Sequence, residues 1–508
     1  MLINTLINRH SDKITGVISC FDRVLIRGTL QCFGNPPEMT YYLNQQGIKI
    51  FDFPKFADPI RLNLRSNAEK IATEHGIEIE YIRKNNFRKD DRIKEILKSR
   101  GYHPGLVHIF SAMEPCSTYK PWHNKQTHKT YLMPGTGKCI HYYFYFIDES
   151  LGLCYIRVQT WAPYRLQIYF NGHNLLSSQL DDHNIKYQML DNAFTYIDDF
   201  NKAQELSDEF SVEKLHVILN KFAELYCPVG KEYNFAYHWS IMQAEYSTDI
   251  VFEKQEYLQA IYDNLTRTAI HTVKPDNIAT FLGKKLHPNF NDEIGNNYNT
   301  RIEGTRIKHS MGQASIKMYD KFGKILRIET TINDVSFFKH YREVRHRDGT
   351  KEMKMAAMRK SIYSFVPLMK IMYASNFRYL DFISTIEDNH AGTKRLEKIS
   401  KTLKDNNRNY KGFNFFDKKD LNLFEIIIRG EFNISGFQNK DIRKLLKLTC
   451  SQVCRMFKRL RVHGLIKKVS HSYKYYLTKL GRLMIVTALK LRELVIIPQL
   501  AVDFYCNN

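Results

Sequence analysis

Three segments with the composition of β-strands follow one another in the first half of the chain, separated only by turn residues. They span Cys139–Asp148, Cys154–Thr160 and Arg165–Phe170. Parallel strands need a crossover of about a dozen residues or more, whereas antiparallel strands are joined by short turns. The spacing therefore predicts an antiparallel meander. The helical pattern of Asn174–His183 predicts a helix directly after it.

Strand and helix patterns are mixed along the rest of the chain. The fold class that they predict is α+β, with antiparallel sheet regions and flanking helices. An Asn-rich stretch, 295–304, predicts a loop or a join between subdomains. The other predicted strands are Thr15–Thr29, Leu106–Ser111 and Thr305–Thr331, and the other predicted helices are Asn67–Glu74, Asp90–Arg100, Glu253–Thr272, Asn277–Lys285 and Ser361–Ile386.

The length of 508 residues favours several domains, at about 150 residues for each. We predict an N-terminal α/β region over 1–135 and a mixed α+β core with antiparallel sheets over 136–345. A helical connector over 346–420 and a winged helix-turn-helix over 421–508 would follow.

The chain is strongly basic, with 75 Lys and Arg against 53 Asp and Glu and a formal net charge of +22. Solubility needs far less charge, and the usual partners of such a surface are nucleic acid or anionic lipid. The 31 Tyr and 32 Phe favour nucleic acid, because exposed aromatic rings stack on bases. A cytosolic enzyme with a high pI is the alternative.

Membrane and secretion signals are not found in the sequence. The most apolar stretch, Leu483–Val502, is interrupted by Lys490, Arg492, Glu493 and Pro498, so it does not have the run of about eighteen apolar residues that a span needs. The N-terminus does not have the pattern of a signal peptide. Nine Cys without a C-x-x-C pair fit reduced thiols. We expect a cytoplasmic protein without a membrane partner.

The end of the chain predicts a compact DNA-binding fold. Three helical segments, two short strands and a closing helix follow in that order, which is the order of a winged helix-turn-helix. Thr449 is the expected N-cap of the third helix and Gly464 is expected to end it. The predicted helices are Leu421–Arg429, Asn439–Leu446, Ser451–His463 and Leu480–Leu491, and the predicted strands are Leu465–Val469 and Tyr473–Thr478.

The stretch RLRVHGLIKKV and the following YKYYLTKLG resemble the end of the recognition helix and the wing of MarR-like winged-helix proteins. The charge of this region agrees with DNA as the partner, since residues 431–508 hold 15 Lys and Arg against 4 Asp and Glu. Gln452 and Arg455 are expected to reach base edges. The other predicted nucleic-acid-binding residues are Lys458, Arg459, Arg461, Lys467, Lys468 and Lys474.

A β-hairpin is predicted upstream, over Ser315–Thr331. A loop of Lys321-Phe322-Gly323 would set Asp320 opposite Lys324, with Gly323 in the left-handed region. Ile316, Met318, Leu326 and Ile328 then share one face, whereas the polar face holds Lys317, Tyr319, Arg327 and Glu329. This polar face is a candidate active-site surface, and a solvated face is the alternative.

The hairpin string MYDK followed by LRIE is similar to a segment of rolling-circle replication initiators. In that family an acid binds a divalent metal and a Tyr attacks a DNA phosphodiester. The resemblance implies that Glu329 is a metal ligand and that Lys321 or Arg327 contacts phosphate. Tyr319 is the candidate nucleophile on this hairpin, and Mg²⁺ or Mn²⁺ is the expected metal.

A second acidic cluster precedes the hairpin in the sequence. Tyr246 lies beside Glu245 and near Asp249, a combination that supplies a nucleophile and metal-binding carboxylates. A helix N-terminal turn is the alternative for this segment. Asp22 on the first predicted strand is another candidate catalytic carboxylate, and with Asp148 and Glu329 it would also suit a two-metal RNase H-like transposase.

These patterns together predict a DNA-binding protein of a mobile or replicating genetic element. It would recognise DNA through the winged helix and nick or join strands with a divalent metal, as a replication initiator or a transposase does. Two alternatives remain open, which are a non-enzymatic MarR-like transcriptional regulator and an RNA-binding protein. The sequence leaves a homo-oligomeric state open as well.

Overall fold

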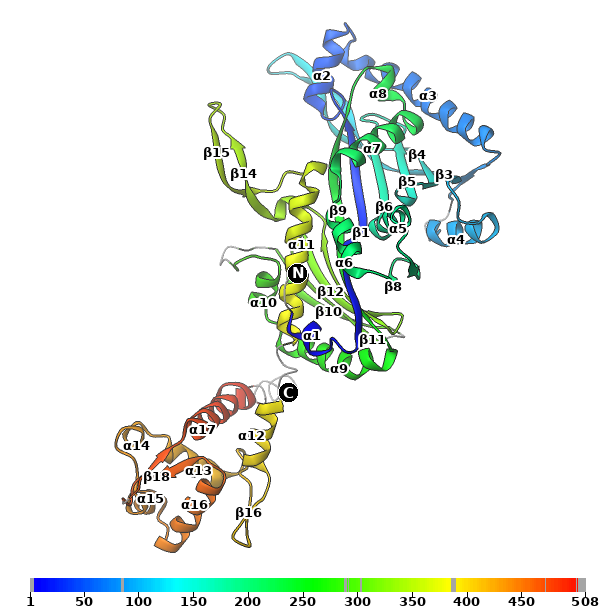
Figure 1. Ribbon diagram of the computed structural model, residues 1–508. Coiled ribbons are helices and arrows are strands. Elements are labelled where there is room, and N and C mark those ends of the chain that lie inside the picture. Colours follow the sequence, from blue (N-terminus) through cyan, green and yellow to red (C-terminus); the bar gives the residue numbers. More distant parts are fainter. Residues whose placement is uncertain are drawn as a thin grey trace. The chain divides into compact units, whose positions relative to one another are not determined.

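The computed structural model describes residues 4–83, 86–286, 290, 292–301, 304–384, 390–470, 472–498 and 500. The chain divides into two compact units, Met1–Thr385 and Ile386–Asn508 (Figure 1). The first unit contains a large sheet with helices on both faces. The second unit is mainly helical.

The first unit is built on an eleven-stranded sheet with the order β10-β11-β12-β13-β9-β1-β6-β5-β4-β3-β2. β2 and β3 are parallel, and the other neighbouring strands with a described register are antiparallel. The predicted α+β class and the meander of β4, β5 and β6 are confirmed. The strands are β1 (Ile14–Leu30), β2 (Ile79–Tyr81), β3 (Gly105–Asn124), β4 (Lys129–Asp148), β5 (Gly152–Gln159), β6 (Leu166–Asn171), β9 (Tyr237–Phe252), β10 (Ile294–Arg301), β11 (Gly304–Met311), β12 (Ala314–Lys321) and β13 (Ile325–Ile332).

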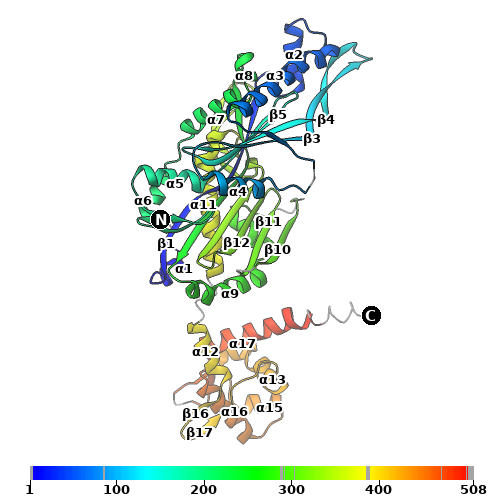
Figure 2. The same ribbon diagram turned by 90° about the vertical axis from the view of Figure 1, so that its right-hand side faces the viewer.

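Helices cover the two faces of this sheet unequally. α3, α7, α9 and α11 share one large apolar core with the strands, and both views show α11 running along the sheet (Figure 1 and Figure 2). On the opposite face, α4 and α5 form two small separate cores. The helices of the first unit are α1 (Thr5–Arg9), α2 (Pro36–Gln45), α3 (Phe53–Glu74), α4 (Lys89–Arg100), α5 (Gly172–Asp182), α6 (Phe200–Asp208), α7 (Val212–Tyr226), α8 (Val229–Glu232), α9 (Gln255–Thr272), α10 (Pro275–Phe281) and α11 (Phe365–Ser384).

β1 is the strand that joins the two halves of the sheet. It is 17 residues long, pairs with β9 on one side and pairs with β6 along its second half on the other. Phe21 lies opposite Tyr246 and Val24 lies opposite Ala244, so Asp22 and Arg23 together face the single residue Glu245. This arrangement is a β-bulge, which changes the direction of the side chains beside it.

One sequence prediction about elements is too short and one is wrong. The helix predicted over Asn67–Glu74 is confirmed, but it is the end of the longer helix α3, because Pro54 lies in the first turn of that helix and Pro59 is accommodated inside it. The loop predicted over 295–304 is mostly strand, as β10 and β11 pair across it. β10 is the outer strand of the sheet, so it does not need the apolar alternation of an inner strand.

The predicted hairpin is formed by β12 and β13, with a loop one residue further along than expected. Lys321 lies opposite Ile325, and the loop residues Phe322 and Gly323 have φ angles of 60° and 73°. Each residue of β12 therefore pairs with a β13 residue two positions further along than predicted. Side chains alternate between the faces with a period of two, so they stay on the predicted faces. Lys317, Tyr319, Arg327 and Glu329 share one face of the sheet, as the sequence predicts.

Two small antiparallel ribbons accompany the sheet in the first unit. β7 (Tyr187–Met189) pairs with β8 (Phe194–Ile197) close to α5. β14 (Lys339–Arg345) pairs with β15 (Lys351–Ala357), and this ribbon projects from the body of the unit in Figure 1.

The elements predicted over 421–508 occur in the second unit in the predicted order, with an additional short helix, Gly430–Ser435, between the first two predicted helices. Thr449 caps α16 by accepting a hydrogen bond from the Gln452 backbone N–H, and Gly464 follows the helix with a φ of 73°, so both predicted end signals are confirmed. Phe424, Val453 and Leu460 belong to its buried core. The elements are α12 (His390–Ser400), β16 (Leu403–Asp405), β17 (Arg408–Tyr410), α13 (Lys418–Ile427), α14 (Gly430–Ser435), α15 (Asn439–Leu446), α16 (Cys450–Val462), β18 (Ile466–Lys468), β19 (Tyr475–Leu477) and α17 (Lys479–Leu491).

The predicted domain boundaries fall within elements or ribbons. The boundary between 135 and 136 lies within β4, the one between 345 and 346 lies at the end of β14, and the one between 420 and 421 lies within α13. β3 and β4 pair along 105–148, so the strands on both sides of the first boundary belong to one sheet. None of the described helices is long and apolar enough to cross a bilayer.

Burial of His309 on β11 predicts a pH dependence of stability. Its ring nitrogens contact Asn296 Oδ1 at 2.6 Å and Tyr379 Oη at 3.1 Å, and burial lowers its pKa from 6.5 to about 4. The unfolded chain therefore takes up a proton that the folded chain excludes, so stability falls as the pH falls from about 6.5 towards about 4.

The unfolding free energy of the parent chain should fall between about pH 7.5 and about pH 5. In His309→Gln we expect this fall to be smaller by about 2 kcal/mol. Denaturant unfolding of both proteins at the two pH values measures this difference. An equal loss in the variant and in the parent chain would contradict the assignment of this pH dependence to His309.

Candidate active site

The polar face of the first unit gathers candidate residues from four neighbouring strands. β1 contributes Asp22 at its bulge, and β9 contributes Glu245 and Asp249. β13 and β12 contribute the polar face of the hairpin. The carboxylates of Asp22, Glu245 and Glu329 each place an oxygen within 4.8 Å of the other two. Residues separated by about three hundred positions thus meet on one face.

Arg327 is the central cation of this cluster. Its side chain is fully buried, and its guanidinium donates to both oxygens of Asp249 at 2.6 Å and to Asp22 Oδ2 at 3.1 Å. It also donates to the backbone oxygen of Asn192 at 2.6 Å. The prediction that Arg327 contacts phosphate is therefore wrong, because two carboxylates and a carbonyl already bind its guanidinium.

The carboxylate of Asp22 is fixed by several neighbours. Asn171 and Asn192 donate to its Oδ1 at 2.8 and 2.6 Å, and His173 Nδ1 lies 3.4 Å from the same oxygen. Burial by itself would raise the pKa of Asp22, but the charge of Arg327 and the contacts with its other neighbours lower it well below the usual range. Asp22 is therefore ionised and held in one orientation.

Glu245 and Glu329 form a second charged group beside the first. Lys317 Nζ donates to Glu329 Oε1 at 2.5 Å and to Glu245 Oε1 at 3.2 Å. Burial and the charge of Glu329 raise the pKa of Glu245 even with Lys317 present. The two carboxylates thus hold more negative charge than this one ammonium group offsets.

Tyr319 and Lys321 lie on β12 beside these carboxylates and are half-buried. The Tyr319 hydroxyl donates to Glu329 Oε2 at 2.8 Å, and burial together with the Glu329 charge raises the pKa of the phenol. Lys321 donates to the side chain of Asn192, and burial and the charge of Arg327 lower its pKa to about 8. Tyr319 therefore has a proton acceptor in place, and Lys321 holds its proton less tightly than an exposed lysine does.

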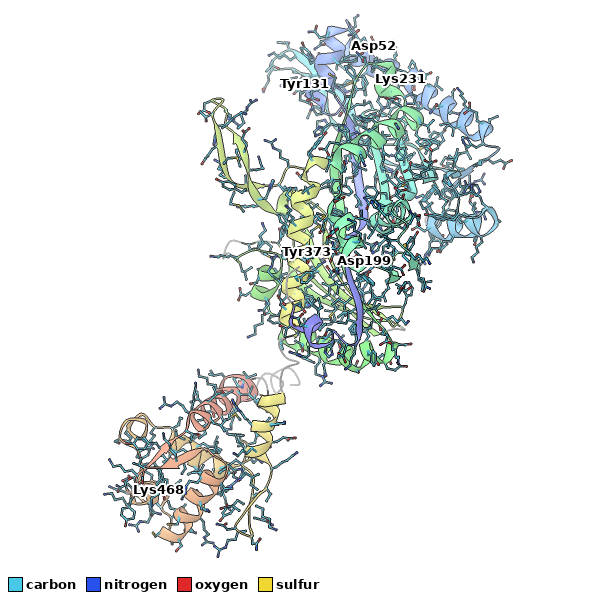
Figure 3. All side chains as sticks on the ribbon, in the orientation of Figure 1. Asp52, Tyr131, Asp199, Lys231, Tyr373 and Lys468 are labelled. Carbon is cyan, nitrogen blue, oxygen red and sulfur yellow. The ribbon has the colours of Figure 1, made fainter. Side chains whose placement is uncertain are left out.

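Tyr246 is not part of this cluster. It follows Glu245 on a strand, so its side chain points to the opposite face, where it is fully buried and packs on Phe21 with ring centroids 5.2 Å apart. There it lines a cavity of about 880 Å³ together with Gln204 and Tyr373, the last of which is labelled on α11 in Figure 3. The grouping of Tyr246 with Glu245 and Asp249 as one site is wrong, as is the helix-turn alternative.

Asp148, the third acid of the RNase H-like alternative, lies apart from the site. It ends β4, and its carboxylate accepts hydrogen bonds from the backbone N–H groups of Ser150 and Leu151 at 2.9 and 3.0 Å. Among the described residues, the acids that converge with Glu329 as a three-ligand group are Asp22 and Glu245. The Asp22, Asp148 and Glu329 combination is therefore wrong.

The three converging carboxylates fit a hard divalent cation. Mg²⁺ and Mn²⁺ prefer carboxylate oxygens, and the uncompensated charge on Glu245 and Glu329 is what such an ion would neutralise. Lys317 already donates to two of the three carboxylates. A bound ion would therefore share Glu245 and Glu329 with this ammonium group, and Asp22 would be the third ligand.

Three residues that complete the site were not found from the sequence. Asn171 accepts a hydrogen bond from the His173 backbone N–H as the N-cap of α5, and it donates to Asp22 at the same time. His173 is the second residue of that helix, whereas Asn192 lies in the turn between β7 and β8. The pair Asn171-Gly172 at the start of α5 signals a turn. It lies far from Asp22 in the sequence, so no local pattern indicates that the two residues are in contact.

A groove on the same face reaches two of the residues that hold Asp22. Two cavities, of about 290 and 640 Å³, share Arg23, Tyr145 and Tyr155 in their walls, and the smaller one reaches Asn171 and Asn192. Tyr155 stacks on Tyr169 with ring centroids 5.2 Å apart. The charged residues that line the groove include cations and acids, and Glu114 binds Arg157. The cations are Arg23, Arg88, Lys89, Lys94 and Arg157, and the acids are Asp90, Asp91, Glu114 and Asp191.

The predicted nucleic-acid-binding residues of the second unit divide into two groups. Gln452, Arg455, Arg461, Lys467, Lys468 and Lys474 are exposed, and Lys468 is labelled on its ribbon in Figure 3. Arg459 instead donates to both oxygens of Asp420 at 2.7 and 2.8 Å and covers the ring of Phe413. Lys458 pairs with Asp405 at 2.6 Å. Arg459 thus holds α16 to the rest of the unit, so its guanidinium is already occupied by Asp420 and does not project to a DNA partner.

Comparison of the chain with models of known protein families, with curated proteins and with solved structures found no match. The function of the protein has therefore to be inferred from the geometry of its site.

Removal of the central cation tests how the cluster is held. We expect Arg327→Met to lower the unfolding free energy by about 3–5 kcal/mol, because Asp22 and Asp249 would be left buried without their partner. The double variant Arg327→Met with Asp249→Asn should recover part of this loss, since it removes one uncompensated charge. Denaturant unfolding measures both, and additive losses in the double variant would contradict the pairing.

Proposed function

We propose that this protein binds DNA through its second unit and cuts or joins a DNA strand at the acidic cluster of the first unit with the help of Mg²⁺ or Mn²⁺. The observation that carries the proposal is the convergence of Asp22, Glu245 and Glu329 beside the hydroxyl of Tyr319. A mobile or replicating genetic element is the biological setting that such a combination favours.

The residues of the cluster can supply the nucleophile, the proton acceptor and the proton donor of a phosphodiester cleavage. Tyr319 Oη would attack the phosphorus atom and pass its proton to Glu329, which already accepts its hydrogen bond. The bond from phosphorus to the leaving oxygen breaks, and Lys321 on the same face is the candidate donor of a proton to that oxygen. A divalent ion held by Asp22, Glu245 and Glu329 would supply charge stabilisation to the phosphate oxygens.

The groove beside the cluster supports a nucleic-acid substrate. Its half-buried tyrosines Tyr155 and Tyr169 offer ring faces, and Arg23 lies over the ring of Tyr169 at 5.5 Å from its centroid. Cations and aromatic rings together are the usual lining of a channel for a single strand. The groove reaches Asn171 and Asn192, which both hold Asp22.

The second unit supports DNA recognition by its element order and its charge. α16 exposes Gln452 and Arg455 near its start, and the ribbon of β18 and β19 exposes Lys467 and Lys468 beside it. A helix in the major groove with a basic ribbon on the phosphates is the arrangement that we propose.

Strand cleavage tests the catalytic part of the proposal. Purified protein is incubated with supercoiled plasmid that carries the DNA flanking its own gene, with Mg²⁺ or Mn²⁺, and with an EDTA control. We expect metal-dependent nicking and a protein–DNA adduct that protease removes. Tyr319→Phe should lower adduct formation by about 10³-fold or more, because it removes the attacking oxygen.

Tyr246→Phe is the matched control, since it deletes the same atom from β9 of the same sheet, on the opposite face. It should nick and form adduct like the parent chain. Glu329→Gln should lose cleavage by about 10²–10⁴-fold while it retains DNA affinity. Binding that is equal in EDTA and in Mg²⁺, without any cleavage, would contradict the catalytic part and favour a transcriptional regulator.

The two arginines of α16 provide a separate test of DNA recognition. Arg455→Ala should weaken DNA binding by about 1–3 kcal/mol without a change in thermal stability, because Arg455 is exposed. Arg459→Ala should lower the stability of the second unit, because Asp420 loses a bidentate partner. Fluorescence anisotropy and thermal unfolding measure the two effects. Lower stability in Arg455→Ala, together with weaker DNA binding and unchanged stability in Arg459→Ala, would contradict the proposed orientation of α16.

A further inference from the structure

The ribbon of β14 and β15 has no role in the proposed chemistry, yet it is a prominent feature of the first unit. It extends from the body as two paired strands joined by a tight turn (Figure 1). Its ladder runs from Lys339 opposite Ala357 to Arg345 opposite Lys351. The residues of both strands are exposed or half-exposed along this whole ladder.

A ribbon with two open faces buries little of its own surface. Two-stranded hairpins are marginally stable in water unless another surface covers them. Tyr341, Met353 and Met355 share one face of the ribbon, and their side chains are 64%, 52% and 60% exposed. Three large apolar side chains that project together into solvent indicate a surface that a partner covers.

The charge of the ribbon specifies what kind of partner fits. Residues 339–360 contain eight Lys and Arg against three Asp and Glu. Lys351 and Lys354 pair with acids of the ribbon itself. Lys339, Arg345 and Arg347 are exposed, and among the described residues no carboxylate lies in ion-pair distance of them. These three cations are therefore available to an anionic partner.

The dimensions of the ribbon match a groove of duplex DNA. Seven residues per strand extend about 24 Å, and paired strands lie about 4.8 Å apart. The major groove of B-DNA is about 12 Å wide and admits a two-stranded ribbon, whereas the major groove of an RNA duplex is too narrow for side chains to enter. The shape thus favours DNA over RNA.

We propose that the β14–β15 ribbon inserts into the major groove of duplex DNA, with Lys339, Arg345 and Arg347 on phosphates and the face of Tyr341 and Met355 towards the bases. This inference rests on the proposed function in that the same DNA would be the substrate of the acidic cluster. It assigns the first unit a duplex-binding element of its own, in addition to the helix and ribbon of the second unit.

The salt dependence of DNA affinity tests this inference. Fluorescence anisotropy of the full chain with a labelled DNA duplex, in EDTA and over a range of NaCl concentrations, gives the slope of log K against log [NaCl]. The triple variant Lys339→Gln, Arg345→Gln and Arg347→Gln should reduce the slope by about 0.9 for each phosphate that it no longer neutralises, which is about 2.7 in total.

Lys214→Gln, Lys221→Gln and Lys231→Gln together are the matched control, because they remove the same charge from exposed positions on α7 and α8. The slope of this control should stay that of the parent chain. The charge-conserving triple of Lys339→Arg, Arg345→Lys and Arg347→Lys should retain the slope as well, which shows that the reduction comes from charge and not from a disturbed fold.

Equal slopes for the ribbon triple and the control triple would overturn the inference. An equal reduction of slope with an RNA duplex as the probe would also overturn it, because it would indicate contact outside a DNA groove. Cleavage plays no part in these measurements. A reduced slope without any nicking activity would therefore support the ribbon as a DNA contact while the catalytic proposal fails.

Discussion

The buried ion pairs of Arg327 are the interaction on which the first unit depends. A guanidinium without solvent contact costs several kcal/mol in lost hydration, so it is stable only with its partners in place. Its partners are Asp249 on β9 and Asp22 on β1, and Arg327 itself lies on β13. The ion pairs thus tie three neighbouring strands together on the polar face, in addition to their backbone hydrogen bonds.

The same interaction divides the acids of the site into two groups. Asp22 and Asp249 are held by Arg327, whereas Glu245 and Glu329 turn towards Lys317 and Tyr319. Asp22 belongs to both arrangements, because one of its oxygens lies within 4.8 Å of an oxygen of Glu245 and of Glu329. A structural network therefore positions one of the candidate metal ligands, which is how rigid sites are commonly supported.

Strand periodicity explains which site residues the sequence could predict. Lys317, Tyr319, Arg327 and Glu329 were placed on one face although the predicted loop is one residue away from the observed one. The faces were correct because side chains alternate with a period of two, and this register change preserves the alternation. The same rule separates Tyr246 from Glu245 and Asp249, and their grouping failed because the segment was not identified as a strand.

Local patterns in the sequence determined the α+β class, the meander, the polar face of the hairpin and the order of elements in the second unit. These features could be predicted because strand alternation, helical spacing and end signals such as Thr449 and Gly464 each involve only a few neighbouring residues. Only the tertiary structure decided that Asp22 meets Glu329, that Arg327 is buried rather than free for phosphate, and that Arg459 binds Asp420. The contacts of Asp22 and Arg327 depend on the order of strands in the sheet and on the bulge in β1, which bring together residues about three hundred positions apart. Contacts between such distant residues leave no periodic signal in the sequence.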